Sequence, residues 1–120
     1  MIRNPGGRPA RRYRTLGTGS VAISVMVAAE LRFGAAKRGD PRLLRRVDEF
    51  VGGIDVRPFE VPADAVYGDL RARLESHGIT IGALDMLIAA HAMALDCTLV
   101  TDNVREFSRI DGLAVENWLR

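Results

Sequence analysis

Three acidic residues occur in apolar parts of the sequence, where burial would normally select against a charge. Glu30 follows five apolar residues, Asp85 interrupts a long apolar stretch, and Asp102 directly follows a short apolar segment and precedes Asn103. An isolated carboxylate in such surroundings is costly to desolvate unless a cation or a hydrogen-bond donor satisfies it. We therefore take Glu30, Asp85 and Asp102 as candidate catalytic residues and candidate metal ligands.

The residue types indicate which metal and which chemistry these positions suit. The sequence has two histidines and one cysteine, so clustered carboxylates favour a hard cation such as Mg²⁺ or Mn²⁺ over Zn²⁺. Such an ion can activate water and stabilise developing charge in phosphodiester hydrolysis. The sequence contains no glycine-rich phosphate loop, Ser-His-Asp set or zinc-binding spacing. His91 lies in an apolar stretch, where we expect a hydrogen-bonded core residue rather than a ligand.

Two of the candidate positions also have purely structural explanations. Asp85 falls in the first turn of an expected helix, where the helix dipole favours an acid. Asp102 and Asn103 could form a turn or an N-cap ahead of the next helix. Glu30 has no comparable explanation, because a buried glutamate is rare without a partner. These alternatives stay open from the sequence alone.

Short apolar strands alternate with helices along the chain. Ser24 can cap one helix, Gly39 can end it, and Pro41 can open the next. The expected elements are a strand at 21–24, helices at 25–37 and 41–51, a strand at 54–60, helices at 62–77 and 83–95, a strand at 98–101, a helical turn at 103–109 and a strand at 115–119. This alternation predicts an α/β fold with a parallel sheet covered by helices. Ligands bind beyond the carboxyl ends of such strands, where we expect the candidate residues to converge.

Helix 41–51 has apolar residues spaced three and four apart, which predicts one buried stripe. The stripe consists of Leu43, Leu44, Val47, Phe50 and Val51.

Composition limits the class of protein. With 120 residues, of which 48% are hydrophobic and 27% charged, the chain fits one folded domain. No apolar run approaches the ~20 residues of a membrane span, and no apolar stretch precedes Val21 to suggest a secretory signal. The single cysteine, Cys97, excludes a disulfide framework, and its neighbours predict a buried thiol. We therefore expect a cytoplasmic protein.

The N-terminal part of the sequence is basic. Residues 1–20 hold five arginines and no acid, whereas the remaining residues hold twelve basic and fifteen acidic side chains. Prolines and glycines at 4–9 predict a flexible segment at 1–8 and an ordered domain at 9–120 that opens with a short helix at 9–16. A nucleic-acid-binding module that uses Arg3–Arg14 is one functional hypothesis, and its binding would depend on salt but not on metal.

Four segments, in order, resemble the PIN-domain ribonuclease toxins of bacterial toxin–antitoxin pairs, called VapC. The resemblance covers about residues 18–120 and is specific because the order of the segments agrees as well as their content. The segments are Val21–Ser24 with Ala29–Gly34, Ile81–Ala92, Leu99–Phe107 and Gly112–Trp118.

The resemblance assigns roles to the candidate residues. Glu30 and Asp85 match the second and third acids of the family's metal site, and the fourth position falls on Asp102 or Asn103. It further implies RNA cleavage with Mg²⁺ or Mn²⁺, a homodimer, and silencing by a cognate antitoxin.

The sequence also departs from the family pattern. The family begins with a central strand that ends in Leu-Asp-Thr-Asn and carries the first metal ligand, whereas the first acid here is Glu30. Without that strand we expect its neighbours to lack backbone partners and divalent binding to weaken. We expect residues 1–120 to hydrolyse RNA feebly or not at all. Two hypotheses follow: a metal-dependent endoribonuclease toxin, or an inactive remnant that binds an antitoxin or a partner toxin subunit.

Overall fold

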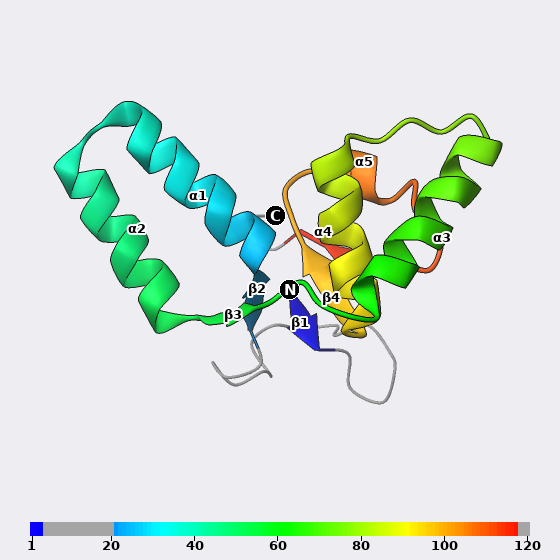
Figure 1. Cartoon of the computed structure of the whole chain (residues 1–120), viewed down its shortest axis with the longest axis horizontal. Coiled ribbons are helices and arrows are strands. Elements are labelled where there is room, and N and C mark those ends of the chain that lie inside the picture. The colour runs from blue at the N-terminus through cyan, green and yellow to red at the C-terminus, as the bar shows by residue number, and fades with distance from the viewer. Residues whose placement is uncertain (4–20, 118–120) are drawn as a thin grey trace.

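The structure, a computed structural model, describes residues 1–3 and 21–117 and has an α/β fold (Figure 1). Strands and helices alternate much as the sequence predicts. In chain order they are β1 Ile2–Arg3, β2 Ala22–Ser24, α1 Val25–Arg38, α2 Pro41–Gly53, β3 Asp55–Arg57, α3 Ala63–Ser76, α4 Ala83–Ala94, β4 Cys97–Val100, α5 Val104–Phe107 and β5 Val115–Glu116. The helices predicted at 25–37, 41–51, 62–77 and 83–95 are confirmed to within a few residues. Strands β2 and β3 are shorter than expected, β4 lies one residue earlier than expected, and the strand expected at 115–119 extends beyond the described residues.

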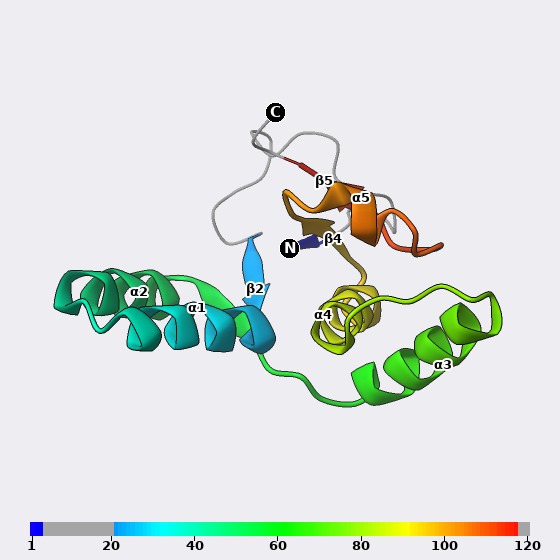
Figure 2. The ribbon, with the colours of Figure 1, turned by 90° about the horizontal axis from the view of Figure 1, so that it is seen from above.

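Local interactions explain where the first two helices begin and end. The side chain of Ser24 accepts a hydrogen bond from the Met26 amide at 3.0 Å, which satisfies a free donor at the start of α1. Gly39 ends α1 in the left-handed conformation at φ 66°, and its N–H donates to the carbonyl of Ala35. Asp40 then caps α2 by accepting from the Arg42 amide at 2.9 Å. The two helices consequently form a hairpin, which projects from the rest of the protein (Figures 1 and 2).

The strands form two small sheets. Strand β2 pairs in parallel with β3, and β4 pairs in parallel with β5. The short β1 adds to the other edge of β4 in the antiparallel sense, with Ile2 opposite Thr98. The predicted parallel pairing is therefore found, but it is divided between two sheets, and the sequence did not predict β1.

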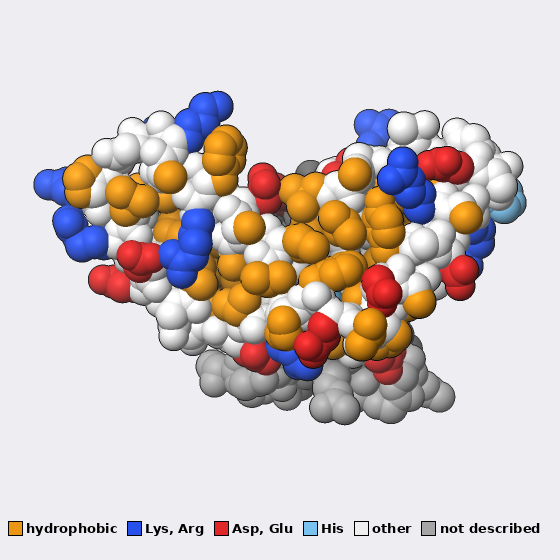
Figure 3. Space-filling view, viewed as in Figure 1, with side chains coloured by type: hydrophobic (Ala, Val, Ile, Leu, Met, Phe, Trp, Pro, Cys, Tyr) orange, Lys and Arg blue, Asp and Glu red, His pale blue; other side chains and the backbone are white. Residues whose placement is uncertain are grey.

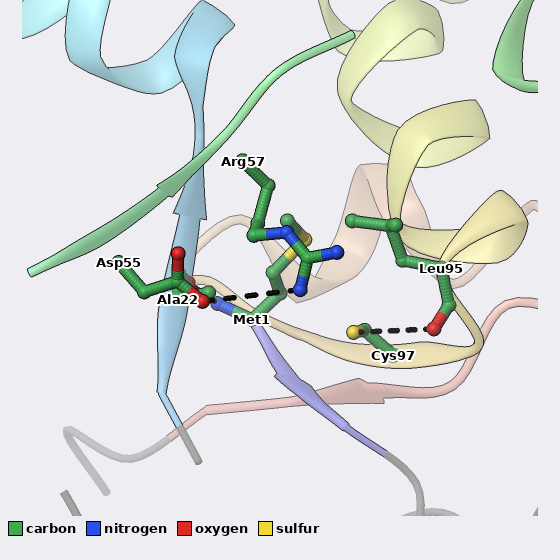
Figure 4. A network of polar contacts seen from close by, with 6 residues as sticks. All are labelled: Met1, Ala22, Asp55, Arg57, Leu95 and Cys97. Atoms are coloured by element: carbon green, nitrogen blue, oxygen red, sulfur yellow. Dashed lines mark hydrogen bonds and ion pairs between the residues drawn. The ribbon is translucent and has the colours of Figure 1, made fainter. Parts of the chain in front are cut away.

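The backbone of Met1 connects the two sheets. Its amino group donates to the carbonyl of Ala22 at 2.7 Å, and the Ala22 amide donates back to the Met1 carbonyl at 2.9 Å. Figure 4 shows Met1 beside Ala22 of β2 and Cys97 of β4. Met1–Arg3 thus supplies part of the pairing that we expected to be missing between β2 and β4.

This placement differs from the flexible segment expected for residues 1–8, because Met1 is buried and residues 2–3 form β1. The domain start expected near Pro9 and the short helix expected at 9–16 lie outside the described residues.

The core lies between α3, α4 and β4. Leu70, Ala89 and Ile110 are among its most buried members, and Cys97 is buried with them as predicted.

The buried stripe predicted on α2 is wrong, since no α2 residue is buried and Phe50 is 50% exposed. The α1–α2 hairpin points away from the core, which leaves α2 only α1 to pack against. Figure 3 shows apolar side chains on the face that the hairpin and the α3–α4 pair share. No helix in the described ranges is long and apolar enough to cross a membrane.

Candidate active site

A cavity of about 560 Å³ opens between the start of α1, the first turns of α4 and the end of β4. Asp85, Asp102 and Asn103 all line it, so three of the four predicted site residues come together. The other lining residues are mainly apolar and come from the same elements. They are Val27, Ile88, Leu99, Val100, Thr101, Phe107 and Asn117.

The secondary structure explains how these polar side chains reach one cavity. Asp85 is half-buried in the first turn of α4, which follows Gly82. Asp102 and Asn103 are exposed and follow β4 after one intervening residue, at the carboxyl end of that strand, as expected from the sequence. The amide of Asn103 donates to the Thr101 hydroxyl at 3.0 Å, which stabilises the turn before α5.

Glu106 of α5 joins this group, although it is not among the predicted site residues. Asn103 Nδ2 donates to Glu106 Oε2 at 3.1 Å, and the Glu106 carboxyl is also close enough to Asp85 to act on its charge. The sequence contains a signal for this position, because Glu106 follows Asn103 by three residues, which is the spacing of a helix-capping pair. Its proximity to Asp85 appears only in the folded chain.

The contact between these two carboxyl groups changes the acidity of the site. Burial raises the pKa of Asp85, and the neighbouring Glu106 carboxyl raises it further. The pair therefore disfavours two uncompensated negative charges, which a proton or a cation would relieve.

The structure does not bring Glu30 into the cavity. Its side chain is exposed, and it is not among the lining residues. It lies three residues after Val27 on α1, so the two residues share one face of that helix. Glu30 is thus on the side of α1 that leads to the cavity, beyond the cavity wall.

The donor set suits one class of metal ion. Among residues 1–3 and 21–117, no group of three or more His, Cys, Asp or Glu side chains is placed to hold a metal. The described site instead offers the Asp85–Glu106 pair and the oxygens of Asp102 and Asn103. Mg²⁺ commonly binds through one or two carboxylates together with water and substrate phosphates. The residues present fit such an ion better than they fit a closed protein cage.

The sequence matches the PIN domain family over residues 4–113. The chain belongs to the PIN domain family. Ribonuclease VapC2 of Rickettsia felis is 41% identical over 100 residues, which cover 82% of this chain and 75% of that protein. The tRNA(fMet)-specific endonuclease VapC of Shigella flexneri is 36% identical over 118 residues, which cover 98% of this chain and 89% of that protein. The resemblance to VapC in the sequence is therefore confirmed.

Solved structures support the PIN fold. A DNA-bound VapBC complex from Salmonella typhimurium contains a chain with a TM-score of 0.83 and 35% identity, over 89% of this chain and 81% of that one. VapBC2 from Rickettsia felis, bound to a DNA fragment from its promoter, gives a TM-score of 0.76 and 42% identity, over 81% of this chain and 74% of that one.

A buried polar contact connects two walls of the PIN-domain cavity. His91 Nδ1 of α4 lies 2.7 Å from the hydroxyl of Ser24, the residue that caps α1. The Phe59 ring packs edge-on against His91 at 5.3 Å between ring centroids. Burial lowers the pKa of His91, with the charge of Arg57 acting in the same direction and the Pro58 carbonyl and Glu60 opposing it. His91 is the hydrogen-bonded core residue predicted from the sequence, and it holds the start of α1 against α4.

Proposed function

We propose that this PIN domain is a metal-dependent endoribonuclease and the toxin of a type II toxin–antitoxin pair. One observation carries the proposal: Asp85, Asp102 and Asn103 line one cavity, and Glu106, a neighbour of Asp85, accepts a hydrogen bond from Asn103 at its edge. The names of the Rickettsia felis and Shigella flexneri relatives, a ribonuclease and a tRNA endonuclease, support RNA as the substrate class.

The side chains of this site have distinct parts in the proposed reaction. Asp85 and Glu106 would hold Mg²⁺ or Mn²⁺, with Asp102 or Asn103 offering a further oxygen. When bound, the ion supplies an activated water and stabilises charge on the reacting phosphate. Asn103 fixes the orientation of Glu106 by donating to its carboxylate. The apolar walls around Ile88 lower the local dielectric constant, which strengthens attraction between the carboxylates and a cation.

Glu30 remains part of this proposal as a ligand at the edge of the site. Its position on the same face of α1 as Val27 supports that role, whereas its exposure means that it makes no contact with the carboxyl pair in the structure described. A change of the Glu30 side-chain rotamer or a small movement of α1 would be required.

The proposed partners are the RNA substrate, a cognate antitoxin and a second copy of the chain. The solved VapBC complexes from Rickettsia felis and Salmonella typhimurium support the antitoxin, because each contains a chain similar to this one. Exposed apolar side chains on the α1–α2 hairpin, including Phe33 and Phe50, support contact with protein. A cytoplasmic location, expected from the composition, belongs to the same proposal.

A second candidate function is an inactive remnant that acts only by binding an antitoxin or a toxin subunit. The observation in its favour is that no three-ligand metal cluster exists among the described residues. RNA cleavage by residues 1–120, measured with Mg²⁺, with Mn²⁺ and with EDTA, separates the candidates when Mn²⁺ binding is measured alongside. Cleavage that EDTA abolishes, even at the low rate expected for residues 1–120, supports the ribonuclease, and so does Mn²⁺ binding without detectable cleavage. Absence of both Mn²⁺ binding and cleavage supports the remnant.

A further inference from the structure

The α1–α2 hairpin carries a basic surface at its tip, away from the cavity. Five cationic side chains gather there, two in the last turn of α1 and three in the first turns of α2, and all five are exposed. We name this surface the hairpin tip. It consists of Lys37, Arg38, Arg42, Arg45 and Arg46.

None of the five side chains of the hairpin tip forms an ion pair with another described residue. The ion pairs in the described part of the chain involve Arg32, Arg57 and Arg71 instead. Asp40 is the only acid between residues 33 and 47, and its carboxylate accepts from the Arg42 amide as the cap of α2. The nearby Arg32, by contrast, pairs with Asp48. The tip therefore presents a concentrated positive charge to solvent.

The placement of the three arginines on α2 disfavours a purely structural explanation. Arg42, Arg45 and Arg46 are three and four residues apart, so they lie on one face of the helix. They occupy its N-terminal half, where the helix dipole is positive and the first turn holds no acid. Cations there are repelled by the dipole and by one another, so folding stability alone would not select them.

An aromatic side chain completes this surface. Phe33 is 60% exposed, and the Lys37 ammonium lies 5.9 Å from the centre of its ring. Cationic side chains that follow a phosphate backbone, with an aromatic ring on which a base can stack, are the combination that binds single-stranded nucleic acid. The hairpin tip with Phe33 provides both parts.

We infer that the hairpin tip binds backbone phosphates of a single-stranded RNA whose scissile bond lies in the cavity. This inference rests on the proposed ribonuclease function. Helix α1 connects the two places, since Val27 lines the cavity and Lys37 lies ten residues further along the same helix. At 1.5 Å per residue, that separation is about 15 Å. The RNA must then continue for several nucleotides beyond the cavity along α1.

The test is binding of a labelled single-stranded oligoribonucleotide in EDTA, measured by fluorescence anisotropy over a range of NaCl concentrations. The test variant is Arg42→Gln/Arg45→Gln. The matched control, Arg73→Gln/Arg109→Gln, removes the same charge from exposed arginines outside the hairpin. Loss of two phosphate contacts should reduce the slope of log K against log[salt] by about 1.4 and weaken binding about 10- to 30-fold at 0.1 M salt. A dinucleotide, too short to reach the tip, should bind both variants equally.

The outcomes separate this inference from the proposed function. If the tip variant and the control variant gave equal slopes of log K against log[salt], the hairpin tip would not be the RNA site. A loss of RNA binding seen only in Arg11→Gln/Arg12→Gln would overturn the inference as well. If Arg42→Gln/Arg45→Gln bound RNA as the wild type does but no longer bound phosphatidylglycerol vesicles, the surface would be assigned to a membrane instead. Because the assay contains EDTA, a tip-specific loss would support RNA binding even if the protein cleaved no RNA.

Discussion

Replacing Asp85 with asparagine tests the proposed metal site most directly. The amide keeps the size of the side chain and can donate a hydrogen bond to Glu106, but it removes one of the two negative charges of the pair. Burial and Glu106 raise the pKa of Asp85, so folding destabilises its ionised form relative to the unfolded chain. Asp85→Asn should therefore leave the thermal stability unchanged or slightly higher.

The structure limits the size of each effect. Asp85 is only half-buried, so we expect a stability change within about 1 kcal/mol, or no more than about 4 °C in Tm for a chain of this length. Losing one partner of a buried charge pair costs about 2–5 kcal/mol of binding free energy, and the partial exposure of Asp85 places the expected loss of metal-binding free energy near the lower end. A loss of about 2–3 kcal/mol corresponds to Mn²⁺ binding that is roughly 30- to 150-fold weaker. RNA cleavage should decrease by a similar factor or more.

Calorimetric titration with Mn²⁺, thermal melting and RNA cleavage should be measured on the same samples. Asp64→Asn is the matched control, because Asp64 is the first-turn acid of α3 and lies outside the cavity. If both acids acted only on their helix dipoles, each variant would lose about 0.3–1 kcal/mol of stability and keep wild-type Mn²⁺ binding. Wild-type Mn²⁺ affinity in Asp85→Asn would refute the assignment of Asp85 as a ligand.

Three further predictions concern residues around the cavity. Glu106→Gln should lower the pKa of Asp85 towards its ordinary value, since a neighbouring negative charge is removed. NMR titration of the Asp85 carboxyl carbon measures this pKa, and an unchanged value would contradict the carboxyl pair. Ser24→Ala should lower the free energy of unfolding in urea by about 2–4 kcal/mol, because it removes a helix cap and leaves the buried His91 without its Nδ1 partner. Asp40→Ala removes only an exposed cap and should lower it by about 1 kcal/mol. Equal losses of unfolding free energy in the two variants would show that the histidine contact contributes nothing. The lowered pKa of His91 means that the unfolded chain binds a proton at this histidine more readily than the folded chain does. The contribution of His91 to stability should therefore be constant above about pH 6.5, and stability should fall as the pH drops from there to the folded-state pKa. Urea unfolding at several pH values should show this loss in the wild type and a reduced loss in His91→Gln.

The sequence predicted features that depend on local interactions. Ser24, Gly39 and Asp40 each act within a few residues of their own position, so the ends of α1 and the start of α2 could be recognised. The convergence of Asp85 with Asp102 followed from their positions at a helix start and a strand end. These positions are fixed by the α/β order of the elements and need no knowledge of side-chain packing.

The failures involve contacts between distant segments. The stripe on α2 has the spacing of a buried face, but spacing cannot tell whether another element covers it, and here only α1 does. Strand β1 has two residues and no pattern of its own, so its pairing with β4 depends on the fold. Glu106 resembled an ordinary capping residue until the fold placed Asp85 beside it.

The separation of the α1–α2 hairpin from the core has a consequence for local unfolding. Within the hairpin, Ala28 and Ala35 are the buried residues, whereas α4 contributes five buried residues to the other part of the protein. Segments with few buried contacts open at lower free energy than the whole domain, and their amide hydrogens exchange sooner. We therefore expect the amides of α2 to exchange before those of α4. A hairpin that opens by itself can adjust to a protein or RNA partner while α4 and β4 keep the carboxyl pair in place.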